Sequence, residues 1–127
     1  MPIPIEVEAK LAPITIRPLN TAADSKGSIH DDEKARAMGY RGGLVPGVTV
    51  LGYMSRLMQA TFGERWQNNS TFNGRLRRPV YEGADVVVSG VVAEAPSAAN
   101  GDTVSVDLTV TDAEGTVAAF ARATCRI

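Results

Sequence analysis

Histidine and cysteine are almost absent from this chain, which has 127 residues and one of each. Metal centres built from these side chains need several of them close together, so the sequence predicts no metal site. The one cysteine, Cys125, excludes an intrachain disulfide and is compatible with a reducing compartment. It lies in a run of alternating apolar residues, which indicates a packing role.

Neither a dominant charge nor a long apolar run is present. Thirteen basic and fourteen acidic residues give a net charge of -1, so no global positive field would recruit nucleic acid or an anionic membrane. No run approaches the roughly 20 apolar residues of a membrane span, and the N-terminus lacks the basic and apolar parts of a signal peptide. The glycine-rich fingerprints of dinucleotide-binding and phosphate-binding loops are also missing. We therefore expect a soluble, cytoplasmic protein with no nucleic-acid partner, no membrane partner and no bound cofactor.

The length fits one domain, residues 1–127, and the periodicity predicts strands, two helices and then more strands. Within residues 3–17, Pro13 breaks and Pro18 ends an alternation that predicts short or peripheral strands, with apolar residues at Ile3, Ile5, Val7, Ile14 and Ile16. Residues 31–38 predict a short helix that ends at Gly39. Residues 48–62 predict a longer helix that is apolar nearly all round in its first half, and such a helix should be buried.

Four strands should follow the long helix, at residues 70–77, 85–94, 103–111 and 116–126. Asn100-Gly101 suits a tight hairpin turn and 112–115 a longer one, so the last three strands should form an antiparallel meander. A concave sheet can cover most of the circumference of one buried helix. We therefore predict an α+β protein in which a curved antiparallel sheet wraps around a long central helix, which is the hotdog fold.

The single histidine, His30, is the first candidate for chemistry. An imidazole, a nearby carboxylate and the N–H groups of a helix start are together able to activate water beside a polarised carbonyl. Structural roles are also open: a histidine before a helix can simply satisfy a turn, and Asp24 can be an exposed turn residue. Asp31 fits a helix-start carboxylate without chemistry, and Gly47 can be needed only where the loop joins the helix.

The stretch from Ser28 to Gly47 resembles the hydratase motif of MaoC-like enoyl-CoA hydratases. Arg75-Leu-Arg-Arg-Pro-Val-Tyr-Glu-Gly83 is similar to the strand and turn that follow in this family. The resemblance implies the hotdog fold and the reversible addition of water to a trans-2-enoyl thioester, normally giving the (R)-3-hydroxyacyl product. In that family a histidine and an aspartate hold the water, and a glycine N–H polarises the thioester carbonyl.

His30 falls on the family histidine and Gly47 on the family glycine. The family aspartate lies five residues before the histidine, where this chain has Ser25, and Asp24 lies one residue earlier. One extra loop residue would return Asp24 to that place. We therefore expect Asp24, His30 and Gly47 to be catalytic.

Substrate contacts are expected from Ser25, Val48, Arg75 and Arg77, with coenzyme A present only as part of the substrate. The arginines would contact its phosphates, although a solvated strand face explains them equally well. Pairing of exposed sheet edges favours a homodimer, and the resemblance implies an active site shared between the two subunits.

Two other functions stay open. A hotdog thioesterase usually relies on a carboxylate on the central helix, and residues 48–62 contain neither Asp nor Glu. A non-catalytic acyl-thioester-binding protein of a specialised pathway is favoured by the shifted aspartate.

Overall fold

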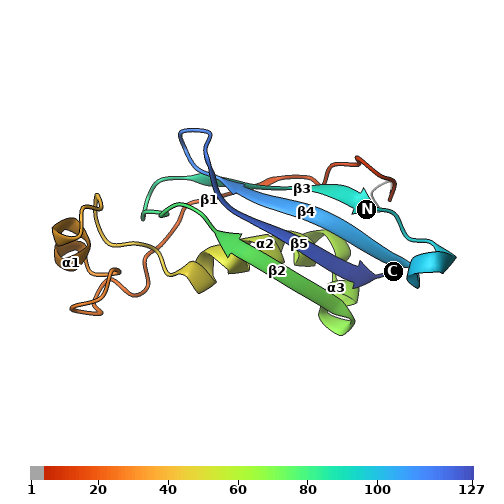
Figure 1. Cartoon of the computed structure of the whole chain (residues 1–127), viewed down its shortest axis with the longest axis horizontal. Helices are drawn as coiled ribbons and strands as arrows, with labels where there is room; N and C mark the ends of the chain where they lie inside the picture. Colours follow the sequence, from red (N-terminus) through yellow and green to blue (C-terminus); the bar gives the residue numbers. More distant parts are fainter. Residues whose placement is uncertain (1–4) are drawn as a thin grey trace.

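Five antiparallel strands form one sheet in the order β1-β3-β4-β5-β2. The computed structural model describes residues 5–127. Its elements are β1 (Ile14–Ile16), α1 (Asp32–Ala37), α2 (Gly47–Phe62), α3 (Glu64–Asn68), β2 (Ser70–Leu76), β3 (Val86–Glu94), the 3-10 turn η1 (Ala98–Asn100), β4 (Thr103–Thr111) and β5 (Val117–Arg126). Figure 1 shows α2 running along one face of the sheet, with α1 and its flanking loops beyond one end.

The core forms where alternate residues of the central strands meet α2. In β4 the inward positions carry Val104, Val106, Leu108 and Val110, all buried. The paired positions of β5 carry Cys125 and three alanines, and because these side chains are small the helix can approach the sheet closely there. Strands β3, β4 and β5 form the expected antiparallel meander. The α+β hotdog architecture is therefore confirmed.

The central helix is buried on one side only. Val50, Met54, Leu57 and Met58 face the sheet and are almost inaccessible to solvent. Val48 is 77% exposed, although the sequence predicted a helix buried nearly all round in its first half. The reason is that the sheet covers one face of the helix, so apolar residues on its other face stay open in a single chain.

The chain before β1 is less regular than predicted. Residues 6–8 form a bend and turn with Glu8 at a positive φ of 75°, so the strand expected around Ile5 and Val7 is wrong. Ile3 lies outside the described residues. Irregular hydrogen bonds from Glu8, Ala9 and Leu11 join this segment to β3 around a single bridge between Lys10 and Val91. Regular strand pairing begins at Ile14.

The sequence also missed α3, which follows Gly63 directly. Its Trp66 packs edge-on against Phe72, with ring centroids 6.4 Å apart, and its indole N–H donates to Ser55 Oγ at 3.0 Å. Short helices of this kind depend on tertiary packing more than on periodicity.

The connection between β3 and β4 is a longer loop than the predicted tight turn. Asn100 uses its side chain to close it, because Oδ1 accepts from the N–H groups of Ser97 and Thr103 and Nδ2 donates to Ala95 O. The positive φ values then fall on Gly101 and Asp102, one residue later than a turn centred on Asn100-Gly101 requires. In the described part of the chain, no helix is both long and apolar enough for a membrane span.

Candidate active site

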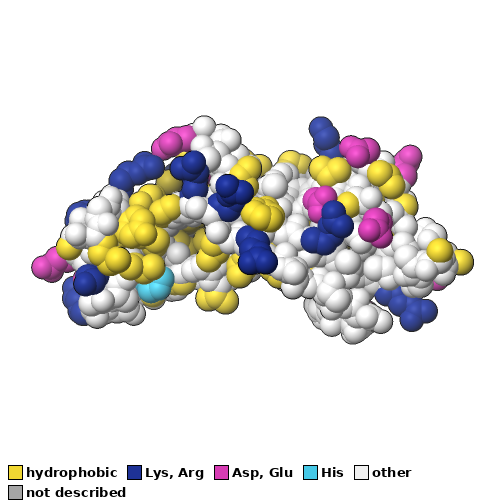
Figure 2. All heavy atoms as spheres, in the orientation of Figure 1, with side chains coloured by type: hydrophobic (Ala, Val, Ile, Leu, Met, Phe, Trp, Pro, Cys, Tyr) yellow, Lys and Arg dark blue, Asp and Glu magenta, His cyan; other side chains and the backbone are white. Residues whose placement is uncertain are grey.

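A cavity of about 260 Å³ opens beside His30 at the N-terminal end of α2. Three segments distant in sequence line it: the loop around α1, the first turn of α2, and the chain that follows β2. Its walls are mostly apolar, with Leu44, Val50 and Leu76 among them. Figure 2 shows the histidine at the surface beside a cluster of hydrophobic side chains, with Lys and Arg side chains nearby.

The His30 ring is oriented by one backbone carbonyl. Its Nδ1 lies 2.8 Å from Leu44 O. A carbonyl oxygen only accepts hydrogen bonds, so Nδ1 carries the hydrogen. In the neutral ring Nε2 therefore keeps its lone pair and can act as a base.

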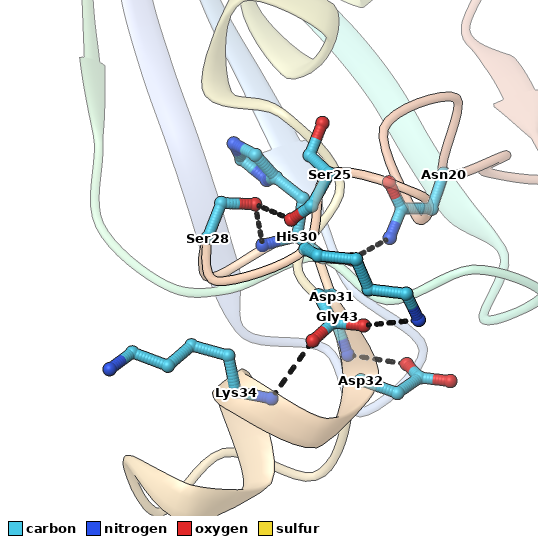
Figure 3. Close-up of polar contacts among 9 residues, drawn as sticks. Asn20, Ser25, Ser28, His30, Asp31, Asp32, Lys34 and Gly43 are labelled. Carbon is cyan, nitrogen blue, oxygen red and sulfur yellow. Dashed lines mark hydrogen bonds and ion pairs between the residues drawn. The ribbon is translucent and has the colours of Figure 1, made fainter.

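The backbone of His30 is fixed as well (Figure 3). Its N–H donates to Ser28 Oγ at 3.2 Å, and its carbonyl accepts from Asn20 Nδ2 at 2.9 Å. Ser28 Oγ in turn donates to Ser25 O at 2.7 Å. Both the N–H and the carbonyl of His30 are thus hydrogen-bonded to the loop, so the backbone that carries the ring is fixed before any ligand binds.

Gly43 lies directly against this histidine. A Cβ at position 43 would be 2.2 Å from His30 O, which leaves no room for a side chain. The Gly43 N–H donates to Asp32 Oδ1 at 2.7 Å, and the next N–H, from Leu44, donates to Ile29 O at 2.9 Å. Hydrogen bonds therefore join the segment after α1 to the start of α1 and to the segment before it, on either side of His30.

Asp31 caps α1, as its place in the sequence indicated. Its Oδ2 accepts from Lys34 N at 3.3 Å, and its Oδ1 lies 3.5 Å from Lys26 Nζ. Its buried carboxylate is thereby engaged by the helix start.

Gly47 begins α2 and lines the cavity. No described group accepts a hydrogen bond from its N–H. Leu76 packs directly on it, since a Cβ at position 47 would be 2.3 Å from Leu76 Cδ1. A free N–H at a helix start beside an apolar wall is a suitable place for a carbonyl oxygen that gains negative charge.

The structure brings together His30, Gly47 and Arg77 of the predicted site residues. Arg77 also lies 6.0 Å from the centroid of the Phe120 ring. Asp24 and Ser25 are exposed and line none of the described cavities.

Two of the predicted substrate contacts also lie away from this cavity. Val48 does not line it, although it follows Gly47 directly. Arg75 lines a separate hollow with Asp107 and Arg122. It alternates along β2 with Gly74 and Leu76, which face α2, so its side chain lies on the other face of the sheet.

Most of the other lining residues were not predicted as site residues, Tyr40 and Leu76 among them. Tyr40 follows the glycine that ends α1, and its N–H donates back to Ala35 O at 3.0 Å. A local sequence pattern gives no signal for it, because the cavity exists only once the chain after β2 lies opposite. Among the described residues, no three His, Cys, Asp or Glu side chains gather closely enough to hold a metal ion.

No family model matches the sequence, and no curated protein matches it. Solved structures share the fold. The (R)-hydratase from A. caviae involved in PHA biosynthesis has a TM-score of 0.78 at 18% identity, covering 98% of both chains. The ChsH1-ChsH2 complex from Mycobacterium tuberculosis has a TM-score of 0.77 at 20% identity, covering 96% of this chain and 98% of that one.

A MaoC-like dehydratase from Rhodospirillum rubrum has a TM-score of 0.72 at 16% identity, covering 95% of this chain and 92% of that one. At such identities the similarity establishes the fold and not the reaction. The chain therefore has the hotdog fold of the (R)-hydratase and MaoC-like dehydratase structures, as the resemblance of its sequence predicted.

Proposed function

We propose that this protein is a hydratase that adds water reversibly to the double bond of a trans-2-enoyl thioester and gives a 3-hydroxyacyl thioester. One observation carries the proposal: the His30 ring and the start of α2 at Gly47 line the same cavity. The shared fold of an (R)-hydratase and a MaoC-like dehydratase supports the reaction class. Coenzyme A would belong to the substrate and would not be a resident cofactor.

Gly47 would hold the thioester carbonyl. Its N–H lies at a helix start, where the macrodipole favours negative charge. The missing Cβ leaves the room that Leu76 fills as a wall beside this N–H. As the enolate forms, charge develops on the thioester oxygen. Each well-placed donor to such an oxygen contributes about 2.7 to 4 kcal/mol to lowering the barrier.

His30 would take the proton from water at Nε2, the nitrogen left free by the contact between Nδ1 and Leu44 O. The water oxygen bonds to the β-carbon while the double-bond electrons move toward the thioester and form the enolate. The imidazolium then returns the proton to the α-carbon. Atoms and charges balance without any other reactant, and dehydration is the same path in reverse.

The role predicted for Asp24 stays a prediction. Its exposed carboxylate lies outside the cavity, so the loop around it would have to move to bring it to the water. Of the two predicted arginines, Arg77 lines the cavity and would contact a coenzyme A phosphate there, while the Arg75 side chain lies on the other face of the sheet.

A homodimer with a shared site is part of the proposal. β2 is an edge strand, and no described residue pairs with its outer side. Val48 and Leu76 expose apolar surface next to Gly47, and Leu76 is 51% exposed. A second copy that pairs along β2 would extend the sheet and cover this surface.

The test is the loss of enone absorbance when the protein is added to crotonyl-CoA. His30→Ala should abolish the change, because removal of a general base costs roughly 10²- to 10⁴-fold in rate. His30→Asn is the matched variant, since its side-chain N–H can still donate to Leu44 O while it offers no base. It should be as inactive as His30→Ala but fold like the wild type.

Other outcomes would favour the alternatives. Release of free thiol without loss of the double bond would indicate a thioesterase. Tight binding of crotonyl-CoA without turnover would indicate a non-catalytic acyl-binding protein, and this alternative is favoured because no Asp or Glu is among the described residues that line the cavity. A wild-type rate in His30→Asn would contradict the proposed mechanism.

A further inference from the structure

The cavity beside His30 contains no carboxylate among its described lining residues. We propose that the hydroxyl of Tyr40 acts with His30 on the reacting water, in the place where the MaoC-like motif has an aspartate. The inference rests on the proposed hydration and names a second group that touches the water.

The carboxylates of the His30 loop are excluded one by one. Asp24 is exposed and lines none of the described cavities. Asp31 is buried as the cap of α1 and accepts the Lys34 N–H. Asp32 accepts the Gly43 N–H and lines a separate, polar cavity of about 350 Å³. Neither Asp31 nor Asp32 lines the cavity that contains His30.

Ser25 occupies the aspartate position of the motif, five residues before His30. Its side chain is exposed and carries no charge. It contributes to the loop through its carbonyl, which accepts from Ser28 Oγ. The sequence has therefore lost the acidic group at this position, and the structure does not replace it with a neighbouring carboxylate.

Tyr40 is the hydroxyl-bearing residue of the cavity. No Ser or Thr is among the described lining residues, and the other polar side chains are His30, Arg77 and Arg78. Its backbone is fixed at the end of α1 by the hydrogen bond from its N–H to Ala35 O. The side chain is half-buried, and its hydroxyl makes no hydrogen bond to a described residue. The hydroxyl is thus available to a ligand or to water.

Water that attacks a double bond must be oriented as well as deprotonated. One O–H of the water points to His30 Nε2. The Tyr40 oxygen accepts a hydrogen bond from the second O–H, which leaves an oxygen lone pair directed at the β-carbon. A phenol oxygen accepts such a bond more weakly than a carboxylate does. This chain should consequently be slower than a variant that regains the acid.

The experiment measures hydration of crotonyl-CoA by the full chain. Tyr40→Phe should lower kcat about 10-fold with little change in KM, as expected for the loss of one hydrogen bond to the reacting water. Tyr81→Phe is the matched control, because the Tyr81 hydroxyl accepts the Arg41 N–H outside this cavity. This control should keep the wild-type rate. Asp24→Asn is the competing arm of the test, because it asks whether the predicted Asp24 carboxylate and not the Tyr40 hydroxyl acts on the water.

The effect of Tyr40→Phe is also measured in the Ser25→Asp variant, in order to separate a structural role of the Tyr40 side chain from a role of its hydroxyl. Ser25→Asp returns the acid to its place in the motif, and in Figure 3 the Ser25 side chain lies on the same side of the loop as the His30 ring, so the longer Asp side chain would extend from there toward the water. It should raise kcat, and in that background Tyr40→Phe should cost much less, because the carboxylate then orients the water. An equal cost in both backgrounds would overturn the inference. So would a wild-type rate in Tyr40→Phe, or a loss in Asp24→Asn that matches the loss in Tyr40→Phe.

Failure of this inference differs from failure of the proposed function. Wild-type turnover that disappears in His30→Asn but persists in Tyr40→Phe overturns the role of Tyr40 alone. No turnover of crotonyl-CoA by the wild type, with the chain folded, overturns both.

Discussion

Gly43 shows how one residue sets the geometry of the site. It lies so close to the backbone carbonyl of His30 that only a hydrogen fits where any other residue has its Cβ. Its N–H also holds Asp32. The position of the imidazole therefore depends on a glycine thirteen residues away in sequence.

We expect Gly43→Ala to displace the His30 loop. It should lower the free energy of unfolding by about 1 to 3 kcal/mol, as overpacking does, and should reduce hydration more than the stability loss explains. Gly52→Ala is the control within the same chain, since a Cβ there meets nothing within 4 Å. It should stabilise α2 by about 0.5 to 1 kcal/mol. Urea unfolding and the crotonyl-CoA assay measure both effects.

At this scale the sequence predicted only residues within two local motifs. His30 and Gly47 belong to one continuous stretch and Arg77 to the other, and all three line the cavity. Tyr40 lies in the same stretch as His30, but nothing in its local pattern distinguishes it from a core aromatic. Leu76 becomes a wall of the cavity only because β2 places it on Gly47. Such contacts depend on the pairing of strands that are far apart along the chain.

Among the elements, α1 is short and depends on its cap. Its six residues are too few for an isolated helix, so the buried Asp31 carboxylate at its start matters more than it would on a long helix. Through α1 this cap also fixes Asp32 and hence Gly43.

Asp31→Ala should lower the free energy of unfolding by about 1 kcal/mol, the usual cost of losing an N-cap. Asp31→Asn can still accept the Lys34 N–H but loses the ion pair with Lys26, whose side chain is exposed. Because exposed ion pairs contribute little, it should stay within a few tenths of a kcal/mol of the wild type. Thermal and chemical unfolding would detect the difference. Equal losses in the two variants would contradict a capping role.

The regular elements could be predicted because each has a clear period or turn signal. The alternation in β4 and the glycines that end α1 and α2 located these boundaries to within about one residue. Ile5 and Val7 have strand-like spacing, yet residues 6–8 form a turn that contacts β3 through one hydrogen bond, from the Glu8 N–H to Val92 O at 2.9 Å. Asn100 carries a turn signal, but it acts through its side chain and not through its own φ.

The whole molecule, as a single chain, leaves β2 at the edge of the sheet and apolar side chains exposed beside the cavity. If two copies cover this surface, the purified protein should have twice the mass of one chain in light scattering. Val48→Lys should shift it toward the monomer and lower the rate with it. Val7→Lys is the control, because Val7 is also exposed but lies in the turn before β1. A monomeric wild type with full turnover would contradict the shared site.

The pairing of β2 with β5 has a consequence for the order in which the molecule assembles. Thr71 of β2 pairs with Thr124 of β5, 53 residues later. The segment that follows β2 directly, residues 77–80, forms one wall of the cavity. During synthesis the histidine loop and the central helix emerge long before the strand that will receive β2. Contacts of such long sequence separation form late and slowly. The cavity beside His30 should thus be among the last parts of the protein to form, and a nascent chain halted before β5 should carry the imidazole without the cavity.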